Sequence, residues 1–269
     1  MTAPILGHRL SGNPDGPPVL LLNGGMMTMG AWEPVAGPLG AEFHVVRCDF
    51  RGQILSPGEP EPNLEAHVAD AVALLDELGL KRVHAAGTSF GGLVALKLAA
   101  LHPGRVASVA VIAATERITP AVWEGSVRAR EAALDAAAGG DGGRVLDFVI
   151  PMTYSPAFQS TWAGVLAAHR KQTALLPPLW FLGIARILST LEGLDLTPDL
   201  PRIQCPALIV AGEADRMFPL EHSRALAEGI HGARLEVVPG GSHGLVIEQP
   251  ARVAEILKDF LLPLAPSAS

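Results

Sequence analysis

The first residues that could do chemistry are a serine and the glycines around it, Gly87, Ser89 and Gly91. The apolar run before them predicts a strand, and the segment after them predicts an apolar-faced helix that ends near Leu101. A serine on such a sharp turn is strained and crowded, so the residues two before and two after it need almost no side chain. The free N–H groups and positive dipole end of the helix would stabilise an oxyanion there. This pattern predicts a nucleophile at Ser89 rather than a plain glycine–serine turn.

The elements that must hold this serine alternate between strands and helices along the chain. Short continuous apolar runs predict strands that are buried on both faces of a parallel sheet. The alternation predicts an α/β fold with a mostly parallel, doubly wound sheet and helices on both faces. Besides the strand and helix on either side of Ser89, the predicted strands are 5–10, 18–22, 43–48, 106–113, 207–211 and 235–238, and the predicted helices are 31–39, 64–78, 221–229 and 251–262.

The alternation stops between about residues 115 and 200. This region contains alanine-rich helical segments, a glycine-rich break at residues 139–143, and clustered tryptophan, tyrosine, phenylalanine and methionine. We therefore expect a core formed by residues 1–115 and 201–269, with residues 116–200 inserted as a helical cap over one end of the sheet.

The composition limits the classes of protein that fit. Of the 269 residues, 49% are hydrophobic and 17% charged, which favours a large core over disorder. The net charge of −7, without a basic run, argues against nucleic acid as a partner. No secretory signal or membrane-length apolar run is present, so a cytoplasmic protein without a membrane partner is expected. Cys48 and Cys205 lack zinc-site spacing and are expected to be structural thiols.

Five segments together resemble the α/β-hydrolase superfamily, in particular its serine carboxylesterase and lactonase-like branch with a helical cap. The resemblance covers essentially the whole chain, and the segments occur in the order that this family uses. The α/β-hydrolase fold is therefore the expected architecture. The matching segments are residues 21–25, 49–52, 87–92, 212–215 and 241–244.

The resemblance implies a catalytic triad in the order nucleophile, acid, histidine. Asp215, in a loop after the predicted strand 207–211, would fix the tautomer of the imidazole and stabilise the imidazolium. His243, in a glycine-rich loop after the last predicted strand, would take the proton of Ser89 and return it to the leaving group. Glu116 is the alternative acid, because some relatives place the acid after the preceding strand.

The resemblance also implies an oxyanion hole built from two backbone N–H groups, those of Phe90 and Gly25. Asn23 replaces the histidine that the family usually has in this loop, and its side chain could form hydrogen bonds in place of that histidine. With this departure, either Gly25 or Met26 could be the second donor. Gln53 also departs from the family pattern, and its loop is expected to give structural support.

A substrate pocket is expected between the core and the inserted region. Most aromatic residues of that region should form its own core, and only some should face the serine. An apolar pocket with adaptable methionines favours an ester of modest size with an apolar acyl or alcohol part. The candidate pocket residues are Met26, Met27, Met152, Tyr154, Trp180, Met217, Phe218 and Leu245.

The serine nucleophile narrows the reaction class. Haloalkane dehalogenases and epoxide hydrolases of this family use an aspartate at this position, and dienelactone hydrolases use a cysteine. Carboxylesterase, lactonase, thioesterase, C–C bond hydrolase and cofactor-free perhydrolase activities remain. Hydrolysis of a small-molecule ester or lactone, without a metal or organic cofactor, is the favoured prediction. A slow-turnover receptor for a small apolar ligand is the alternative outside catalysis.

Overall fold

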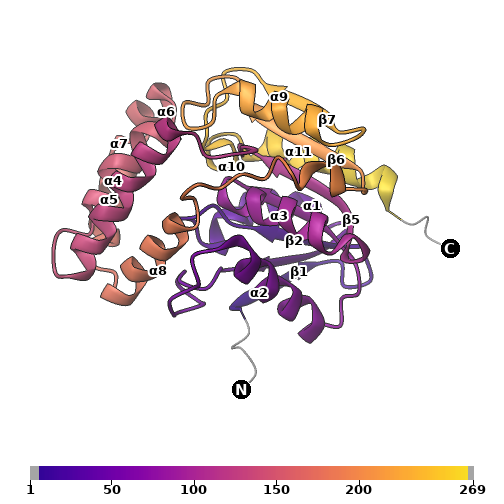
Figure 1. The fold of residues 1–269 in the computed structure, drawn as a ribbon, viewed down its shortest axis with the longest axis horizontal. Helices are drawn as coiled ribbons and strands as arrows, with labels where there is room; N and C mark the ends of the chain where they lie inside the picture. Colours follow the sequence, from indigo (N-terminus) through magenta and orange to yellow (C-terminus); the bar gives the residue numbers. More distant parts are fainter. Residues whose placement is uncertain (1–5, 266–269) are drawn as a thin grey trace.

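A single sheet forms the centre of the computed structural model, which describes residues 6–265, and seven strands of this part of the chain belong to it (Figure 1). The strand order is β1-β3-β2-β4-β5-β6-β7; β1 is antiparallel to β3 and the other neighbours are parallel. The prediction of a mostly parallel sheet is confirmed. The strands are β1 (His8–Gly12), β2 (Pro18–Leu22), β3 (His44–Cys48), β4 (Val83–Thr88), β5 (Val106–Ile112), β6 (Ala207–Gly212) and β7 (Arg234–Val238).

The first strand differs from its prediction at residues 5–10, because β1 begins at His8 and ends at Gly12. Ile5 lies outside the described residues. The pairing of β1 with β3 fixes these bounds, since His8 lies opposite Cys48 and Gly12 opposite His44.

Helices cover both faces of the sheet, which explains why the strands are apolar on both sides. Along β2, Leu20 and Leu22 belong to one hydrophobic core, while Val19 and Leu21 belong to the other. One face packs against α1 (Glu33–Leu39), α10 (Leu245–Glu248) and α11 (Pro250–Leu261), and the other against α2 (Leu64–Glu77), α3 (Phe90–Leu101) and α9 (Leu220–Gly229). Short 3₁₀ turns lie at Met29–Trp32, Pro103–Arg105, Leu200–Arg202 and Leu262–Leu264.

A block of helices separates β5 from β6 in the chain and lies to one side of the sheet (Figure 1). Thr119 and Ser155 cap the first and third of these helices, each accepting a hydrogen bond from a backbone N–H group, and a proline follows each cap. We call α4 (Pro120–Ala137), α5 (Arg144–Thr153), α6 (Pro156–Thr161), α7 (Ala163–Thr173) and α8 (Pro178–Ser189) the helical block. Within residues 6–265, no helix has both the length and the apolar character needed to cross a membrane.

The helical block touches the core very closely at two glycines. A Cβ atom added to Gly183 of α8 would lie 2.4 Å from the Cα atom of Gly52, which has a positive φ of 95°. Only glycine permits both this backbone conformation and this approach. The contact fixes α8 against the loop that follows β3.

His67, on α2, is fully buried and neither ring nitrogen has a hydrogen-bond partner among the described residues. Its ring packs edge-on against Phe50 and Phe90, with centroid distances of 5.5 and 4.9 Å. Burial disfavours the charged imidazolium and lowers the pKa of His67 from 6.5 to about 4.

The change His67→Leu should make the protein less sensitive to acid. Between the unfolded pKa of 6.5 and the folded pKa of about 4, only the unfolded chain binds the proton, so the stability falls as the pH falls. This residue should account for a loss of up to about 3 kcal/mol in the free energy of unfolding. Urea unfolding at about pH 7 and about pH 4.5 measures the loss in both proteins. An equal loss in the variant would contradict the assignment to His67.

Candidate active site

Ser89 lies on the turn between β4 and α3 and has a strained backbone, with φ 51° and ψ −121°. A Cβ atom at Gly87 would lie 2.1 Å from the carbonyl oxygen of Gly91, and one at Gly91 would lie 2.3 Å from the carbonyl oxygen of Leu22. Both positions therefore exclude a side chain, as the spacing of the two glycines predicts. The turn presents Ser89 half-buried at the edge of a cavity.

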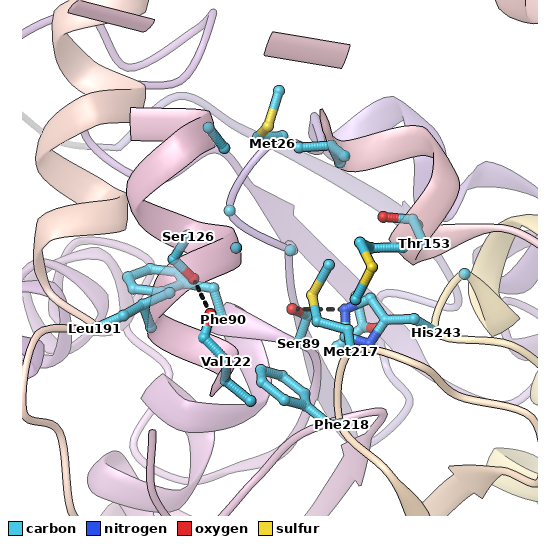
Figure 2. A pocket seen from close by; sticks show the side chains of 18 of the residues that line it. Met26, Ser89, Phe90, Val122, Ser126, Thr153, Leu191, Met217, Phe218 and His243 are labelled. Atoms are coloured by element: carbon cyan, nitrogen blue, oxygen red, sulfur yellow. Dashed lines mark hydrogen bonds between the residues drawn. The ribbon is translucent and has the colours of Figure 1, made fainter. Parts of the chain in front are cut away.

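Three side chains that are far apart in the sequence form one hydrogen-bonded chain, and Figure 2 shows its link between Ser89 and His243. Ser89 Oγ lies 3.0 Å from His243 Nε2, and His243 Nδ1 lies 3.0 Å from Asp215 Oδ2. A carboxylate only accepts hydrogen bonds, so Nδ1 carries the hydrogen and Nε2 accepts from the Ser89 hydroxyl group. Asp215 Oδ1 accepts from the N–H groups of Met217 and Phe218, at 2.8 and 2.9 Å, which fixes the carboxylate.

The loops that carry Asp215 and His243 hold each other in place. The N–H group of Ala214 donates to the carbonyl oxygen of Gly241 at 2.8 Å, so the loop after β6 is bonded to the loop after β7. Glu116, the alternative acid, contacts a different histidine, with His222 Nδ1 2.9 Å from Glu116 Oε2. The geometry thus joins Asp215, and not Glu116, to His243.

A carboxylate also links the histidine loop to the helical block. Glu248 Oε1 accepts from Ser242 Oγ and from the N–H group of Ser155, both at 2.6 Å, and Glu248 Oε2 accepts from Ser155 Oγ at 2.9 Å. The N–H group of Gly244 donates to the carbonyl oxygen of Thr153 at 2.7 Å. The residues on either side of His243 are therefore bonded to the junction of α5 and α6.

Loss of this link should reduce turnover more than substrate affinity. We expect Glu248→Ala to lower kcat by about 10- to 100-fold with a smaller change in KM. A displaced His243 would form a poorer hydrogen bond with the Ser89 hydroxyl group, which slows proton transfer. Glu248→Gln, which keeps the shape and one acceptor, should lose less. Steady-state kinetics on an ester measures both, with Glu255→Ala on the exposed face of α11 as the control. A wild-type kcat in Glu248→Ala would contradict this positioning role.

Two backbone N–H groups beside Ser89 have no hydrogen-bond partner among residues 6–265, those of Phe90 and Gly25. Gly25 lies next to Phe90, since a Cβ atom added to Gly25 would be 3.7 Å from the Phe90 Cβ atom. The N–H group of Met26 is unpaired as well within this range, so both donors that the sequence left open remain available. These groups could stabilise a negatively charged oxygen.

Asn23 forms hydrogen bonds where the family usually has a histidine. Its Nδ2 group donates to Asp49 Oδ1 at 3.0 Å and to Gln53 Oε1 at 3.1 Å. Gln53 Nε2 in turn donates to the carbonyl oxygens of Gly24 and Gly25, at 2.9 and 3.1 Å. These bonds fix the peptide planes of the loop that carries the Gly25 N–H group. The sequence predicted structural support from the loop of Gln53, but it did not show which groups Gln53 contacts.

A cavity of about 710 Å³ opens beside Ser89, between the sheet edge and the helical block. Trp180 and Leu245, two of the eight candidate pocket residues, do not line it. Trp180 is 8% exposed and packs edge-on against Phe181 in the core, while Leu245 is fully buried against the other face of the sheet. The candidates that do line the cavity are Met26, Met27, Met152, Tyr154, Met217 and Phe218.

Several further apolar side chains that line the cavity come from the helical block or follow it directly, and the sequence analysis did not name them as pocket candidates. Figure 2 shows Val122 and Leu191 on the same side of the cavity as Phe90. Ser126 lies among them, but its hydroxyl group donates to the carbonyl oxygen of Val122 in its own helix at 3.2 Å. His169 also lines the cavity, and burial lowers its pKa. The further lining residues from α4, α5 and α8 include Ala129, Leu146, Phe148, Ile187 and Leu188.

The chain is similar to known hydrolases over nearly its whole length. The chain matches the model of the alpha/beta hydrolase family over residues 19–256. It is 33% identical over 256 residues to pimeloyl-acyl-carrier-protein methyl ester esterase of Chromobacterium violaceum, covering 92% of this chain and 95% of the relative. It is 31% identical over 261 residues, 95% of each chain, to a protein named for carbamate hydrolysis, RutD of Caulobacter sp. strain K31. The solved structure of an enol-lactonase from Burkholderia xenovorans LB400 superimposes with a TM-score of 0.85, at 29% identity and 96% coverage of both chains.

Proposed function

The chain belongs to the alpha/beta hydrolase family, and from this premise we propose that it is a serine hydrolase that cleaves a small or medium apolar carboxylic ester or a lactone. The observation that carries the proposal is the hydrogen-bonded chain Ser89–His243–Asp215 at the edge of a largely apolar cavity. One relative is named as a methyl ester esterase and another as an enol-lactonase, and both names support an ester bond as the target.

The proposed reaction proceeds through an acyl-enzyme. His243 Nε2 takes the proton of Ser89 while Oγ attacks the substrate carbonyl carbon, and Asp215 stabilises the resulting imidazolium. The N–H groups of Phe90 and Gly25 bind the tetrahedral oxyanion. The C–O bond to the alcohol then breaks, and the alcohol leaves with the proton from His243. Water hydrolyses the acyl group on Ser89 by the same route and restores the free serine.

The helical block acts in this proposal as the cap that forms the roof of the pocket. Its apolar side chains bind the acyl or alcohol chain and shield that chain from bulk water. Met26, Met152 and Met217 line the same cavity and are adaptable, which favours tolerance of several chain lengths over one fixed substrate.

A chain-length series of chromogenic esters, together with a lactone and a carbamate, tests the proposal. We expect turnover with a maximum at an intermediate chain length, and a peptide containing Ser89 should carry the mass of the acyl group after rapid quenching. The carbamate belongs in the series because one relative is named for that reaction.

A folded protein that binds these esters but neither hydrolyses them nor becomes acylated would contradict the proposal. That result would favour the receptor alternative, or a C–C bond hydrolase or perhydrolase that uses the same three side chains. Thioester substrates with the same acyl chains separate a thioesterase from a carboxylesterase by the ratio of the two values of kcat/KM.

A further inference from the structure

A second histidine–carboxylate pair lines the same cavity, formed by His222 and Glu116. Both residues are buried, with exposed fractions of 8% and 6%. His222 Nδ1 lies 2.9 Å from Glu116 Oε2 and 3.0 Å from Thr115 Oγ1. The exposed Arg117 contacts Glu116 Oε1 at 3.4 Å and balances its charge. The proposed acyl transfer uses none of these groups.

The hydrogen bonds of Thr115 define which nitrogen of His222 carries a hydrogen. Thr115 Oγ1 has two groups within reach that only accept, the carbonyl oxygen of Arg117 at 2.7 Å and Glu116 Oε2 at 3.2 Å, so its hydroxyl hydrogen is directed to these and not to His222. His222 Nδ1 therefore faces lone pairs from both Thr115 and Glu116 and must be the N–H donor. When the ring is uncharged, Nε2 is an acceptor, and no partner for it is found among the described residues.

The pair lies at the same edge of the sheet as Ser89. Glu116 follows β5, which neighbours β4, and His222 lies in the first turn of α9 after β6, which neighbours β5. Val122 and Phe218 line the cavity along with the pair, and the Phe218 ring packs edge-on against the ring of His243 with a centroid distance of 5.1 Å. One cavity is thus lined by the nucleophile, by apolar side chains and by His222.

We propose that Glu116 and His222 form a polar subsite that accepts a hydrogen bond from a hydroxyl group of the substrate, remote from the carbonyl that Ser89 attacks. The inference rests on the proposed function, because it assigns part of the substrate of that same site. A purely alkyl chain would displace water from His222 Nε2 and leave a buried acceptor unpaired, which disfavours such a chain. The substrate class is an ester or lactone whose apolar chain carries a hydroxyl group.

Paired substrates test this subsite. Chromogenic esters of ω-hydroxy acids of increasing length are each compared with the ester that carries a methyl group in place of the hydroxyl group. At the length that reaches His222, the wild type should favour the hydroxy ester by about 10- to 100-fold in kcat/KM. The absence of a preference at every length would overturn the inference.

The change His222→Asn removes the acceptor but keeps a neighbour for Glu116, since the asparagine amide group occupies the place of Nδ1 and can donate to the carboxylate. We expect the preference for the hydroxy ester to fall to within about threefold. An unchanged preference in a folded variant, checked by thermal melting, would overturn the inference.

A second variant, Glu116→Gln, tests the tautomer and does not depend on the first. The glutamine amide group can donate to His222 Nδ1, which allows Nε2 to carry a hydrogen and donate in turn. Esters ending in a methoxy group, which only accepts, should be poor for the wild type and improve relative to hydroxy esters in Glu116→Gln. If the two proteins show the same ratio, His222 does not act as an acceptor.

Binding separates failure of this subsite from failure of the proposed function. Amides that match the hydroxy and methyl-ended esters are titrated into Ser89→Ala, with and without His222→Asn, by calorimetry. The hydroxy amide should bind about 10- to 100-fold more tightly, and only when His222 is present. Tighter binding of the hydroxy amide would support the subsite even if the protein hydrolysed no ester. Equal affinities of the two amides would overturn the inference even if the protein hydrolysed esters.

Discussion

Turnover of an ester by Ser89→Ala should fall by about 10⁵- to 10⁶-fold in kcat relative to the wild type. The variant lacks the oxygen that forms the acyl-enzyme, and within residues 6–265 His243 has no other hydroxyl group among its hydrogen-bond partners. What remains is the contribution of the N–H groups of Phe90 and Gly25 and of substrate binding. Alanine at this position keeps the positive φ of 51° and the size of the cavity, so the fold should persist.

Ser126→Ala is the matched control, because Ser126 lines the same cavity and its hydroxyl group is bonded within its own helix. Its kcat should stay within about threefold of the wild type. Initial rates are measured with the best ester of the chain-length series, and the quenched Ser89→Ala protein should carry no acyl group. A comparable rate in Ser89→Ala would contradict acyl transfer on this serine, whatever the rate of the control.

The residues around Ser89 could be predicted because local constraints determine them. Gly87 and Gly91 are required by contacts within a few residues or with the adjacent strand, so the short motif contains the necessary information. The strands were readable for a similar reason, since burial on both faces produces continuous apolar runs such as Pro18–Leu22.

The residues that line the cavity were harder to predict from the sequence, because the lining depends on how the helical block packs. Trp180 and Leu191 both belong to apolar stretches and are equally buried, each 8% exposed, but only Leu191 lines the cavity. The periodicity of one helix shows that it has an apolar face, and not which neighbour covers that face. The same limit explains why Met152 and Tyr154 could be named only as candidates.

The hydrogen-bond networks of the site were the hardest feature to predict from the sequence. Asn23, Asp49 and Gln53 lie on two loops that meet only in the fold, and the pairing of Glu116 with His222 joins residues 106 positions apart. No local pattern encodes such a contact, because carboxylate, amide and histidine side chains also occur commonly on the solvent-exposed surface. The sequence allowed Glu116 as an alternative acid, and the structure directs it to His222.

The change Asp215→Asn should lower kcat by about 10⁴-fold with little effect on KM. Asp215 Oδ1 accepts hydrogen bonds from the N–H groups of Met217 and Phe218, so the asparagine oxygen must take that place. The asparagine NH₂ group then faces His243 Nδ1, which has to become an acceptor. The hydrogen moves to Nε2, and His243 can no longer take the proton of Ser89.

Two further carboxylates make this prediction specific to Asp215. Glu213 lies two residues earlier, is exposed and bonds only to the N–H group of Gly240, so kcat of Glu213→Gln should stay within about threefold of the wild type. Glu116→Gln should lose less than about 10-fold with an alkyl ester, since Glu116 contacts His222 and not His243. Single-turnover acylation rates for the three variants compare the roles directly. A loss of several orders of magnitude in Glu116→Gln, with Asp215→Asn near the wild type, would mean that the acid of this site follows β5 rather than β6.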